Sequence, residues 1–399
     1  MPTTAVVALA LLAAAPATTS VRTYWVEPSQ VFVQVSASHK VPHLAILERG
    51  NAVQVVGCVP DCAAKDAWAL LSPAGALPLA LLSPEPVAGA IPVDARFVYG
   101  HAKPGAAIHA GPDAKSPRIS RAAGDITLAF VDDAPLAAKG WLRAVDGGYV
   151  STDDVHLIQP STFSGLHNPP DVVAFFLKTT KAKRIHGDPS STDEEIARLA
   201  WREVIDEDHD VVHVPQGNVP RSAVRIAKKR ERPAAIPPDA HWVVVDLDQQ
   251  TLTAYEGDKL VFATLVSTGK PTFETGSGLF QVWYKTRHTT MNGRREPYHV
   301  EEVPDVLYFH GPDGLHGTFW HERFGHTASH GCVNLSPADA RWLFDWAPPT
   351  IPDGWHGVFV QPGETSLWVW VMHGDKAPTT AQAAPLSRPE GSPEDDDDG

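Results

Sequence analysis

The chain has 399 residues, 43% of them hydrophobic and 20% charged, which is the composition of a soluble globular protein with room for two or more domains. The 36 prolines and 30 glycines favour many short strands and turns over long helices. The formal net charge of −14, with no basic stripe along the chain, argues against nucleic acid as a partner.

Residues 1–20 carry no charged side chain, and an apolar run from Ala5 leads into Ala15-Pro16-Ala17. Small residues at this spacing are typical of a secretory cleavage site, so residues 1–20 are predicted to be a signal peptide. An uncleaved anchor is the alternative, but the run is too short to span a bilayer as a typical helix. No later segment of the sequence has transmembrane character. We therefore expect export to the periplasm or cell envelope.

Two of the three cysteines, Cys58 and Cys62, are four residues apart. In an oxidising compartment they can pair across a tight loop, or both can remain reduced. A zinc site is less favoured, because no second ligand pair stands nearby at suitable spacing. A disulfide between them would leave Cys332 as the odd thiol.

Short apolar strands separated by turn residues recur along residues 24–90, 94–160 and 168–228, which predicts three small β modules. The pattern resembles bacterial SH3-like domains. In the third module, residues 194–204 could instead form a helix. Such modules would either hold a wall polymer or act as spacers that orient a later domain.

Charge and proline combine in residues 229–239, which indicates a solvated, extended linker. At the other end of the chain, residues 375–399 are acidic and are expected to be disordered.

Residues 240–374 are predicted to be a β-rich domain. Strand-like runs cover 242–247, 251–255 and 260–266, joined by hairpin turns. A further strand is predicted over 278–284, and a final hairpin over 357–361 and 366–371. The one convincing helix spans 337–346, with Ser336 as its N-cap.

The most informative residues lie just before that helix. Leu315-His316-Gly317 is followed by Ser329-His330-Gly331-Cys332, which places a cysteine on a glycine-preceded turn sixteen residues after His316. A histidine this close in sequence can share a hairpin with the cysteine. Because an adjacent imidazole generates the nucleophilic thiolate, the pair indicates a cysteine acyl-transfer enzyme.

Residues 240–374 resemble the YkuD-type L,D-transpeptidase catalytic domain, a family of cysteine enzymes that cross-link peptidoglycan. The matching segments are 245–252 (VDLDQQTL), 266–270 (VSTGK), 315–318 (LHGT) and 329–335 (SHGCVNL). The chain has Thr275-Gly276-Ser277-Gly278 where the family often has Thr-Pro-x-Gly, and Asn334 where many members have arginine. These departures leave the chemistry intact and the substrate subtype open. The resemblance implies a mainly β fold: a catalytic β-sandwich with one helix after the nucleophile, preceded by SH3-like β-barrel modules.

Attack on a peptide carbonyl needs a nucleophile, a proton acceptor and oxyanion donors. Cys332 is predicted to be the nucleophile and His316 the base. The resemblance implies that the Gly317 carbonyl orients the imidazole. Backbone N–H groups around Gly331 and Cys332 are expected to bind the oxyanion, and the absent side chain of Gly331 would let the substrate carbonyl approach.

Other residues near the signature are expected to support the site. His330 is predicted to act within the turn, with direct proton transfer as the alternative. Ser329 and Asn334 are expected to shape the site by hydrogen bonding, and Asn334 to contact substrate. Tyr298 and Trp320 either line a substrate channel or belong to the core.

The neighbourhood is rich in histidine, which makes a zinc site an alternative to the cysteine mechanism. The possible ligands are His316, His321, His326, His330 and Cys332. No His-Glu-x-x-His or comparable pattern appears, and zinc on Cys332 would quench the nucleophile. We therefore expect neither a metal nor another cofactor.

By resemblance, the partners are peptidoglycan stem peptides. Cys332 would form a thioester with a stem tetrapeptide, release D-alanine and pass the acyl group to an amine, giving a 3→3 cross-link. Water or an envelope protein could instead accept the acyl group, as in a carboxypeptidase, an endopeptidase or a wall-protein anchoring enzyme. A non-catalytic wall-binding protein is the alternative from another class.

Overall fold

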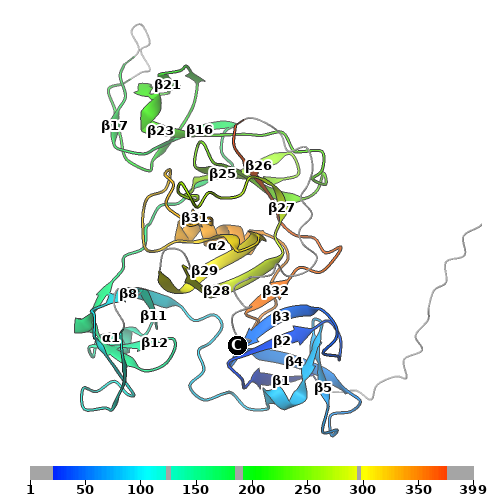
Figure 1. Ribbon diagram of the computed structural model, residues 1–399. Coiled ribbons are helices and arrows are strands. Elements are labelled where there is room, and N and C mark those ends of the chain that lie inside the picture. Colours follow the sequence, from blue (N-terminus) through cyan, green and yellow to red (C-terminus); the bar gives the residue numbers. More distant parts are fainter. Residues whose placement is uncertain (1–20, 123–126, 185–191, 294–297, 375–399) are drawn as a thin grey trace, which may run out of the picture. The chain divides into compact units, whose positions relative to one another are not determined.

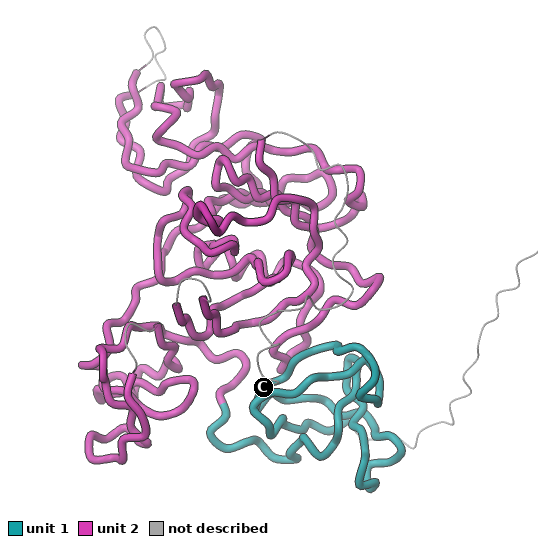
Figure 2. Tube along the Cα trace, viewed as in Figure 1, with its two compact units in different colours: residues 1–90 teal, residues 91–399 magenta. Residues whose placement is uncertain are grey.

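The computed structural model describes residues 21–122, 127–184, 192–293 and 298–374. The chain divides into two compact units, residues 1–90 and 91–399, which are coloured separately in Figure 2 and described here one at a time. The predicted signal peptide and the acidic tail lie outside the described residues.

The first unit is built from short antiparallel strands. Its elements are β1 (Arg22–Val26), β2 (Gln30–Gln34), β3 (His43–Glu48), β4 (Ala52–Val59), β5 (Trp68–Ser72), β6 (Ala76–Pro78), η1 (Leu79–Leu81) and β7 (Leu82–Ser83). The strands pair β1 with β4 and β7, β2 with β3 and β6, and β5 with β4 and β6. Their alternating apolar side chains, Val33, Ile46 and Ala69 among them, form a buried core. The SH3-like assignment remains a prediction.

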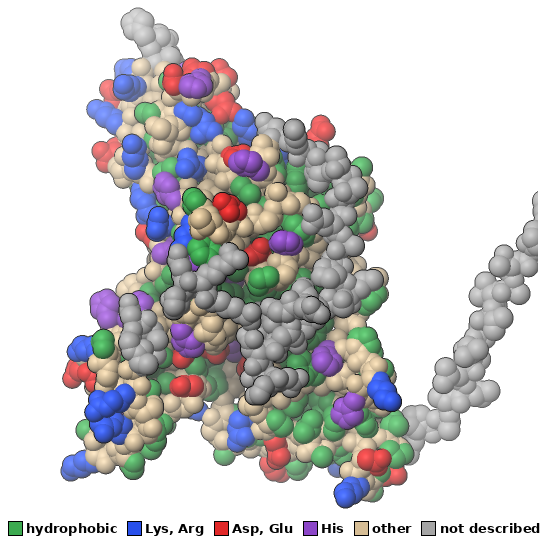
Figure 3. Space-filling model, viewed as in Figure 1, with side chains coloured by type: hydrophobic (Ala, Val, Ile, Leu, Met, Phe, Trp, Pro, Cys, Tyr) green, Lys and Arg blue, Asp and Glu red, His purple; other side chains and the backbone are tan. Residues whose placement is uncertain are grey.

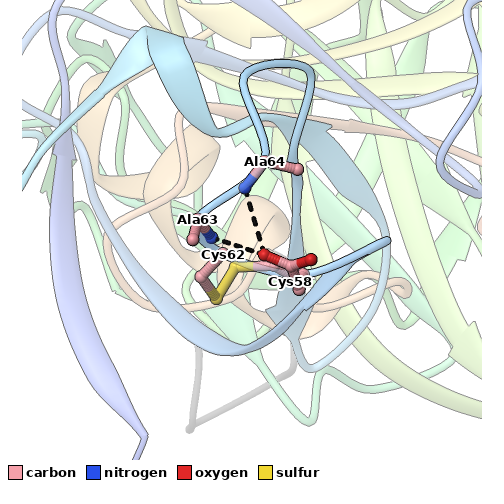
Figure 4. The surroundings of a disulfide bond; sticks show 5 residues. Cys58, Cys62, Ala63 and Ala64 are labelled. Atoms are coloured by element: carbon pink, nitrogen blue, oxygen red, sulfur yellow. Dashed lines mark hydrogen bonds between the residues drawn. A yellow bond between two sulfur atoms is a disulfide. The ribbon is translucent and has the colours of Figure 1, made fainter.

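Cys58 and Cys62 form a disulfide in this unit (Figure 4). The residues between them turn tightly, and the Asp61 carboxylate accepts hydrogen bonds from the N–H groups of Ala63 and Ala64 at 2.8 and 3.1 Å. Within the described residues, Cys332 is consequently the free thiol.

The second unit begins with another set of short strands. They are β8 (Phe97–Ala102), β9 (Ala107–His109), β10 (Arg118–Arg121), β11 (Thr127–Val131), α1 (Ala134–Ala137), β12 (Trp141–Ala144), β13 (Tyr149–Ser151), η2 (Thr152–Asp154) and β14 (Val155–Leu157). Neighbouring strands follow the order β14-β8-β11-β12-β13-β9-β10. Phe130, Leu142 and Val150 lie in the core that they enclose.

Residues 166–228 are extended as well. The elements are β15 (Leu166–His167), β16 (Val172–Phe176), β17 (Thr180–Lys181), β18 (Glu195–Ile196), β19 (Trp201–Glu203), β20 (Asp206–Glu207), β21 (Val211–Val214), β22 (Gly217–Pro220), η3 (Arg221–Ala223) and β23 (Val224–Lys228). The alternative of a helix over 194–204 is wrong, because this stretch contains two strands. Between them Leu199 has a φ of 64°, which is incompatible with a right-handed helix.

Residues 240–374 form two sheets with a helix between them (Figure 1). The elements are β24 (His241–Asp246), β25 (Thr251–Glu256), β26 (Lys259–Leu265), β27 (Gly278–Gln281), β28 (Tyr284–Asn292), β29 (His299–His310), β30 (Asp313–Gly317), β31 (Val333–Leu335), α2 (Pro337–Trp346), β32 (Gly357–Phe359) and β33 (Trp368–Met372). The first sheet has the order β15-β26-β25-β24-β33-β27, and the second β31-β30-β29-β28-β32.

Helix α2 agrees with its prediction, and Ser336 caps it by accepting a hydrogen bond from the Asp339 N–H at 3.2 Å. It packs on β29 and β30, while Trp342 stacks on Phe262 of β26 with ring centroids 4.2 Å apart. The fold is therefore mainly β, with one helix after Cys332, as predicted.

Two strand predictions are wrong in their pairing. The run 278–284 is not one strand, because the chain leaves the first sheet after Gln281 and enters the second at Tyr284. The last two strands do not form a hairpin. Strand β32 pairs with β28 in the second sheet, whereas β33 inserts between β24 and β27 in the first, which explains its nearly continuous apolar sequence.

Residues 229–239, predicted as a solvated linker, instead pack on the first sheet. Ile236 is 1% exposed and joins the cluster around Trp242 and Tyr255. Arg230 and Arg232 form ion pairs at 3.2 and 2.9 Å with carboxylates of this sheet and its turn. The two arginine side chains thus hold this segment against the first sheet.

In the described parts of the chain, no helix combines the length and apolarity needed to span a bilayer. On the face shown in Figure 3, Lys and Arg side chains are interspersed with Asp and Glu.

Candidate active site

His316 and Cys332 lie on neighbouring parallel strands. His316 is in β30, Cys332 directly precedes β31, and the register pairs His316 with Asn334. The prediction of a shared hairpin is wrong, since parallel strands need a crossover and residues 318–332 supply it. The parallel arrangement brings the two candidate catalytic residues to one edge of the second sheet.

The Cys332 thiol lies over the start of β30. The Gly314 N–H donates to Sγ at 3.5 Å, and the Pro312 carbonyl oxygen is 3.7 Å from Sγ. Burial, followed by the nearby Asp313 carboxylate, raises the pKa of Cys332 to about 12. The resting residue is therefore a neutral thiol. Asp313 was not found by sequence reasoning, since nothing local marks it as a neighbour of Cys332.

His316 is 2% exposed, and its Nδ1 is 3.1 Å from the Gly317 carbonyl oxygen. Burial lowers the pKa of His316 to about 4, so the imidazole is neutral near pH 7. Because a carbonyl only accepts, Nδ1 carries the proton and Nε2 keeps its lone pair. The geometry agrees with the predicted role of Gly317 in orienting the ring.

The turn before Cys332 is held by hydroxyl groups. Ser329 Oγ donates to the Cys332 carbonyl oxygen at 2.5 Å and accepts from the Gly331 N–H at 3.2 Å. Thr275 Oγ1 donates to the Gly331 carbonyl oxygen at 2.6 Å. The Gly331 N–H, predicted to bind an oxyanion, is thus committed to Ser329.

Gly331 has a φ of 130°, and a Cβ there would lie 2.4 Å from Asp313 Oδ1. Both the backbone conformation and this carboxylate require glycine, which is a different reason from the predicted approach of substrate.

His330 lies between two aromatic rings at the nucleophile side of the site. Its ring centroid is 4.7 Å from that of Phe273 and 5.0 Å from that of Tyr298. Tyr298 is 36% exposed, and burial together with Cys332 raises its pKa to about 12. Tyr298 is therefore a surface residue beside the thiol, where it can contact a ligand.

The Trp320 ring stacks on the His316 imidazole with centroids 5.9 Å apart. Trp320 and His321 line a cavity of about 260 Å³ together with residues 158–162.

The His321 imidazole joins the site through Asn334, whose amide is 2.9 Å from Nε2. The Arg323 N–H donates to Nδ1 at 3.2 Å. The atom of Asn334 that makes the contact with Nε2 is the amide nitrogen Nδ2. Burial, followed by His316, lowers the pKa of His321 to about 4, so the ring is neutral near pH 7. Sequence reasoning considered His321 only as a zinc ligand and missed this role as a neighbour of the base.

The family model of the L,D-transpeptidase catalytic domain (YkuD) matches residues 240–371. No sequence among curated proteins matches the chain.

Among solved structures, a mutant L,D-transpeptidase of Enterococcus faecium is 26% identical, covering 33% of this chain and 50% of that chain, with a TM-score of 0.27. An L,D-transpeptidase of Stackebrandtia nassauensis is 27% identical, covering 36% and 60%, with a TM-score of 0.26. L,D-transpeptidase 1 of Mycobacterium tuberculosis is 22% identical, covering 34% and 62%, with a TM-score of 0.25. The chain thus spans less than two thirds of each of these proteins.

The matched segment contains both His316 and Cys332, together with both sheets and α2. Residues 240–371 of this chain are a YkuD-type L,D-transpeptidase catalytic domain.

Proposed function

We propose that the protein is a peptidoglycan L,D-transpeptidase acting in the cell envelope. Cys332 Sγ attacks the carbonyl that precedes the terminal D-alanine of a stem tetrapeptide, while its proton passes to His316 Nε2. The imidazolium returns the proton to the departing D-alanine amine, which leaves a thioester. An acceptor amine then loses a proton to His316 and forms the new amide, and the imidazolium returns that proton to the sulfur, which leaves as the thiol. The observation that carries this proposal is the meeting of His316 and Cys332 on adjacent strands of the matched domain.

The two pKa values support general-base catalysis over a preformed ion pair. Burial raises the pKa of Cys332 and lowers that of His316, so complete transfer of the proton to the imidazole before any bond to carbon forms is strongly unfavourable. Such a thiolate would be too scarce to act alone. The proton therefore moves as the carbon–sulfur bond forms, which is a step that a neutral base on the adjacent strand can assist.

We infer that one of the expected oxyanion donors, the Gly331 N–H, is replaced by another. The Gly331 N–H is bonded to Ser329, whereas the Gly314 N–H already points at Sγ. An oxygen on the carbon bound to Sγ would come within reach of the Gly314 N–H. We place the oxyanion between this group and the N–H of Cys332.

Intact-mass spectrometry tests the proposal. The purified chain is incubated with a stem tetrapeptide, or with a carbapenem, whose strained carbonyl can acylate a thiol. We expect one adduct, absent in Cys332→Ala and formed more slowly in His316→Ala. Cross-linked product should require an added amine. Release of free acid at the same rate without amine would indicate a hydrolase, and no adduct on protein with a titratable thiol would refute the proposal.

A further inference from the structure

Residues 318–328, which we call the active-site loop, connect β30 to the turn that carries Cys332. The loop contains one residue that contacts the base and one that contacts the register partner of the base. Trp320 stacks on His316, and His321 bonds to Asn334, the register partner of His316. Any displacement of the loop would therefore change the packing around the His316 imidazole.

The second half of the active-site loop is held by the catalytic domain. Ser267 Oγ donates to the Arg323 carbonyl oxygen at 2.9 Å, and the Gly325 N–H donates to the Val266 carbonyl oxygen at the same distance. The residues that directly follow β26 thus hold this half of the loop.

The first half is held from outside the matched domain. Arg198 Nη1 is 2.7 Å from Oε2 of Glu322, and its Nη2 donates to the Glu322 carbonyl oxygen. Ser161 Oγ donates to Oε1 at 2.6 Å. The guanidinium fork therefore holds both the side chain and the backbone of the residue next to His321, a geometry that a lysine could not reproduce. The hydrogen bond from Ser161, followed by Arg198, lowers the pKa of Glu322.

Two further contacts also come from upstream segments, one to Phe319 in the first half of the loop and one to Gly325 in its second half. The Tyr99 ring, from β8, stacks on Phe319 with centroids 3.5 Å apart and planes within 12°, and its hydroxyl donates to the Glu302 carbonyl oxygen at 2.8 Å. Arg225 Nε, from β23, donates to the Gly325 carbonyl oxygen at 3.0 Å. Residues of β8, Ser161 and the 168–228 segment thus all contact the active-site loop.

We propose that Ser161 and Arg198 are positioning residues that hold Glu322, and with it Trp320 and His321, against the catalytic base. The upstream segments are then part of the catalytic unit, and not only spacers or wall-binding modules. This inference rests on the proposed function of His316 as the base.

The expected effect on catalysis exceeds the effect on stability. Arg198 and Glu322 side chains are 38% and 46% exposed, and ion pairs at such positions contribute little to folding. A small misplacement of a catalytic group, by contrast, lowers rates strongly, so Arg198→Ala should slow acylation of Cys332 about 10-fold. Arg198→Lys, which can keep the ion pair with the Glu322 carboxylate but not the second hydrogen bond to its carbonyl oxygen, should recover part of this loss.

The second readout is the pKa of His316 itself, followed by NMR titration. Water admitted by a loosened loop would raise it from about 4 towards the ordinary value of 6.5, and the acid limb of acylation should move with it. The titratable groups to be accounted for are His321, which interacts with the base, Arg323 beside it on the loop, and Cys332 with its neighbour Asp313 on the nucleophile side.

Arg202→Ala is the matched control, because Arg202 forms a 2.8 Å pair with Glu194 in the same segment without touching the loop. The proposal is overturned if Arg198→Ala keeps the parental acylation rate and the parental His316 pKa, as Arg202→Ala should. It is also overturned if Arg198→Lys acylates at the parental rate, because the two-point hold of the guanidinium would then not be needed. If the parent forms no acyl-enzyme, the proposed function fails, while the His316 titration still decides whether Arg198 positions the loop.

Discussion

If Cys332 and His316 are both neutral at rest, the thiol should react slowly with external reagents, by an amount that follows from its pKa. A thiol whose pKa is raised from the ordinary 9.0 to about 12 has about 1,000-fold less thiolate at pH 7. The intrinsic nucleophilicity of the thiolate rises with its pKa, with a Brønsted slope of about 0.45. The rate constant of the thiolate is therefore roughly 20-fold higher, which offsets part of the loss. The loss of thiolate is the larger effect. Cys332 should therefore react with a small aromatic disulfide about 50-fold more slowly than free cysteine.

The assay is the rate of thiopyridone release from pH 6 to 10, with Cys332→Ser as the blank. Cys58 and Cys62 are joined, so a single thiol is titrated. We expect the rate to rise steadily with pH over the whole range, and no thiolate absorbance at 240 nm near pH 7. Asp313→Asn should raise the rate, since it removes the carboxylate that opposes the thiolate. A rate that is faster than free cysteine and flat between pH 6 and 9 would mean a preformed thiolate, and would refute the neutral-pair reasoning.

Three further outcomes are expected. Because the pKa of His316 is about 4 in the folded chain and about 6.5 when unfolded, its contribution to stability is present above pH 6.5. It is lost as the pH falls through 4, by about 3 kcal/mol in denaturant unfolding, and His316→Asn should flatten this dependence. Thr275→Val should lower the free energy of unfolding by about 2 kcal/mol, because the buried Gly331 carbonyl loses its hydrogen bond. Thr275→Ser keeps the hydroxyl and should retain most of the parental stability, and thermal unfolding compares the two variants. Ser336→Ala removes the cap on the Asp339 N–H and should cost about 1 kcal/mol by the same measurement, with unchanged stability speaking against a capping role.

Local sequence determined the individual elements well. The strands and turns of 242–266 alternate in the expected way and form the predicted hairpins. Helix α2 begins after Ser336 and runs through Trp346 as its periodicity indicates. The SHGC and LHG motifs identified the family of the catalytic domain. Such features depend on neighbours within a few residues, so they can be read without knowledge of the fold.

Pairing between distant segments was decided only by the tertiary structure. The sequence could not indicate that β30 and β31 run parallel, nor that β33 inserts between β24 and β27. Strand periodicity specifies which face of a strand is buried, but not which partner supplies its hydrogen bonds. That choice depends on how both sheets close around α2.

The surroundings of the two catalytic candidates depend on the same long-range packing. Cys332 and His316 were evident from their motifs, whereas Asp313, His321 and Arg198 carry no local signal of their proximity to the site. Arg198 and Glu322 are 124 residues apart in sequence and are joined by two hydrogen bonds. The residue types that perform chemistry were thus determined by sequence alone. Their pKa values and supports were decided by the folded structure, because burial and contact with distant charges exist only after the chain has packed.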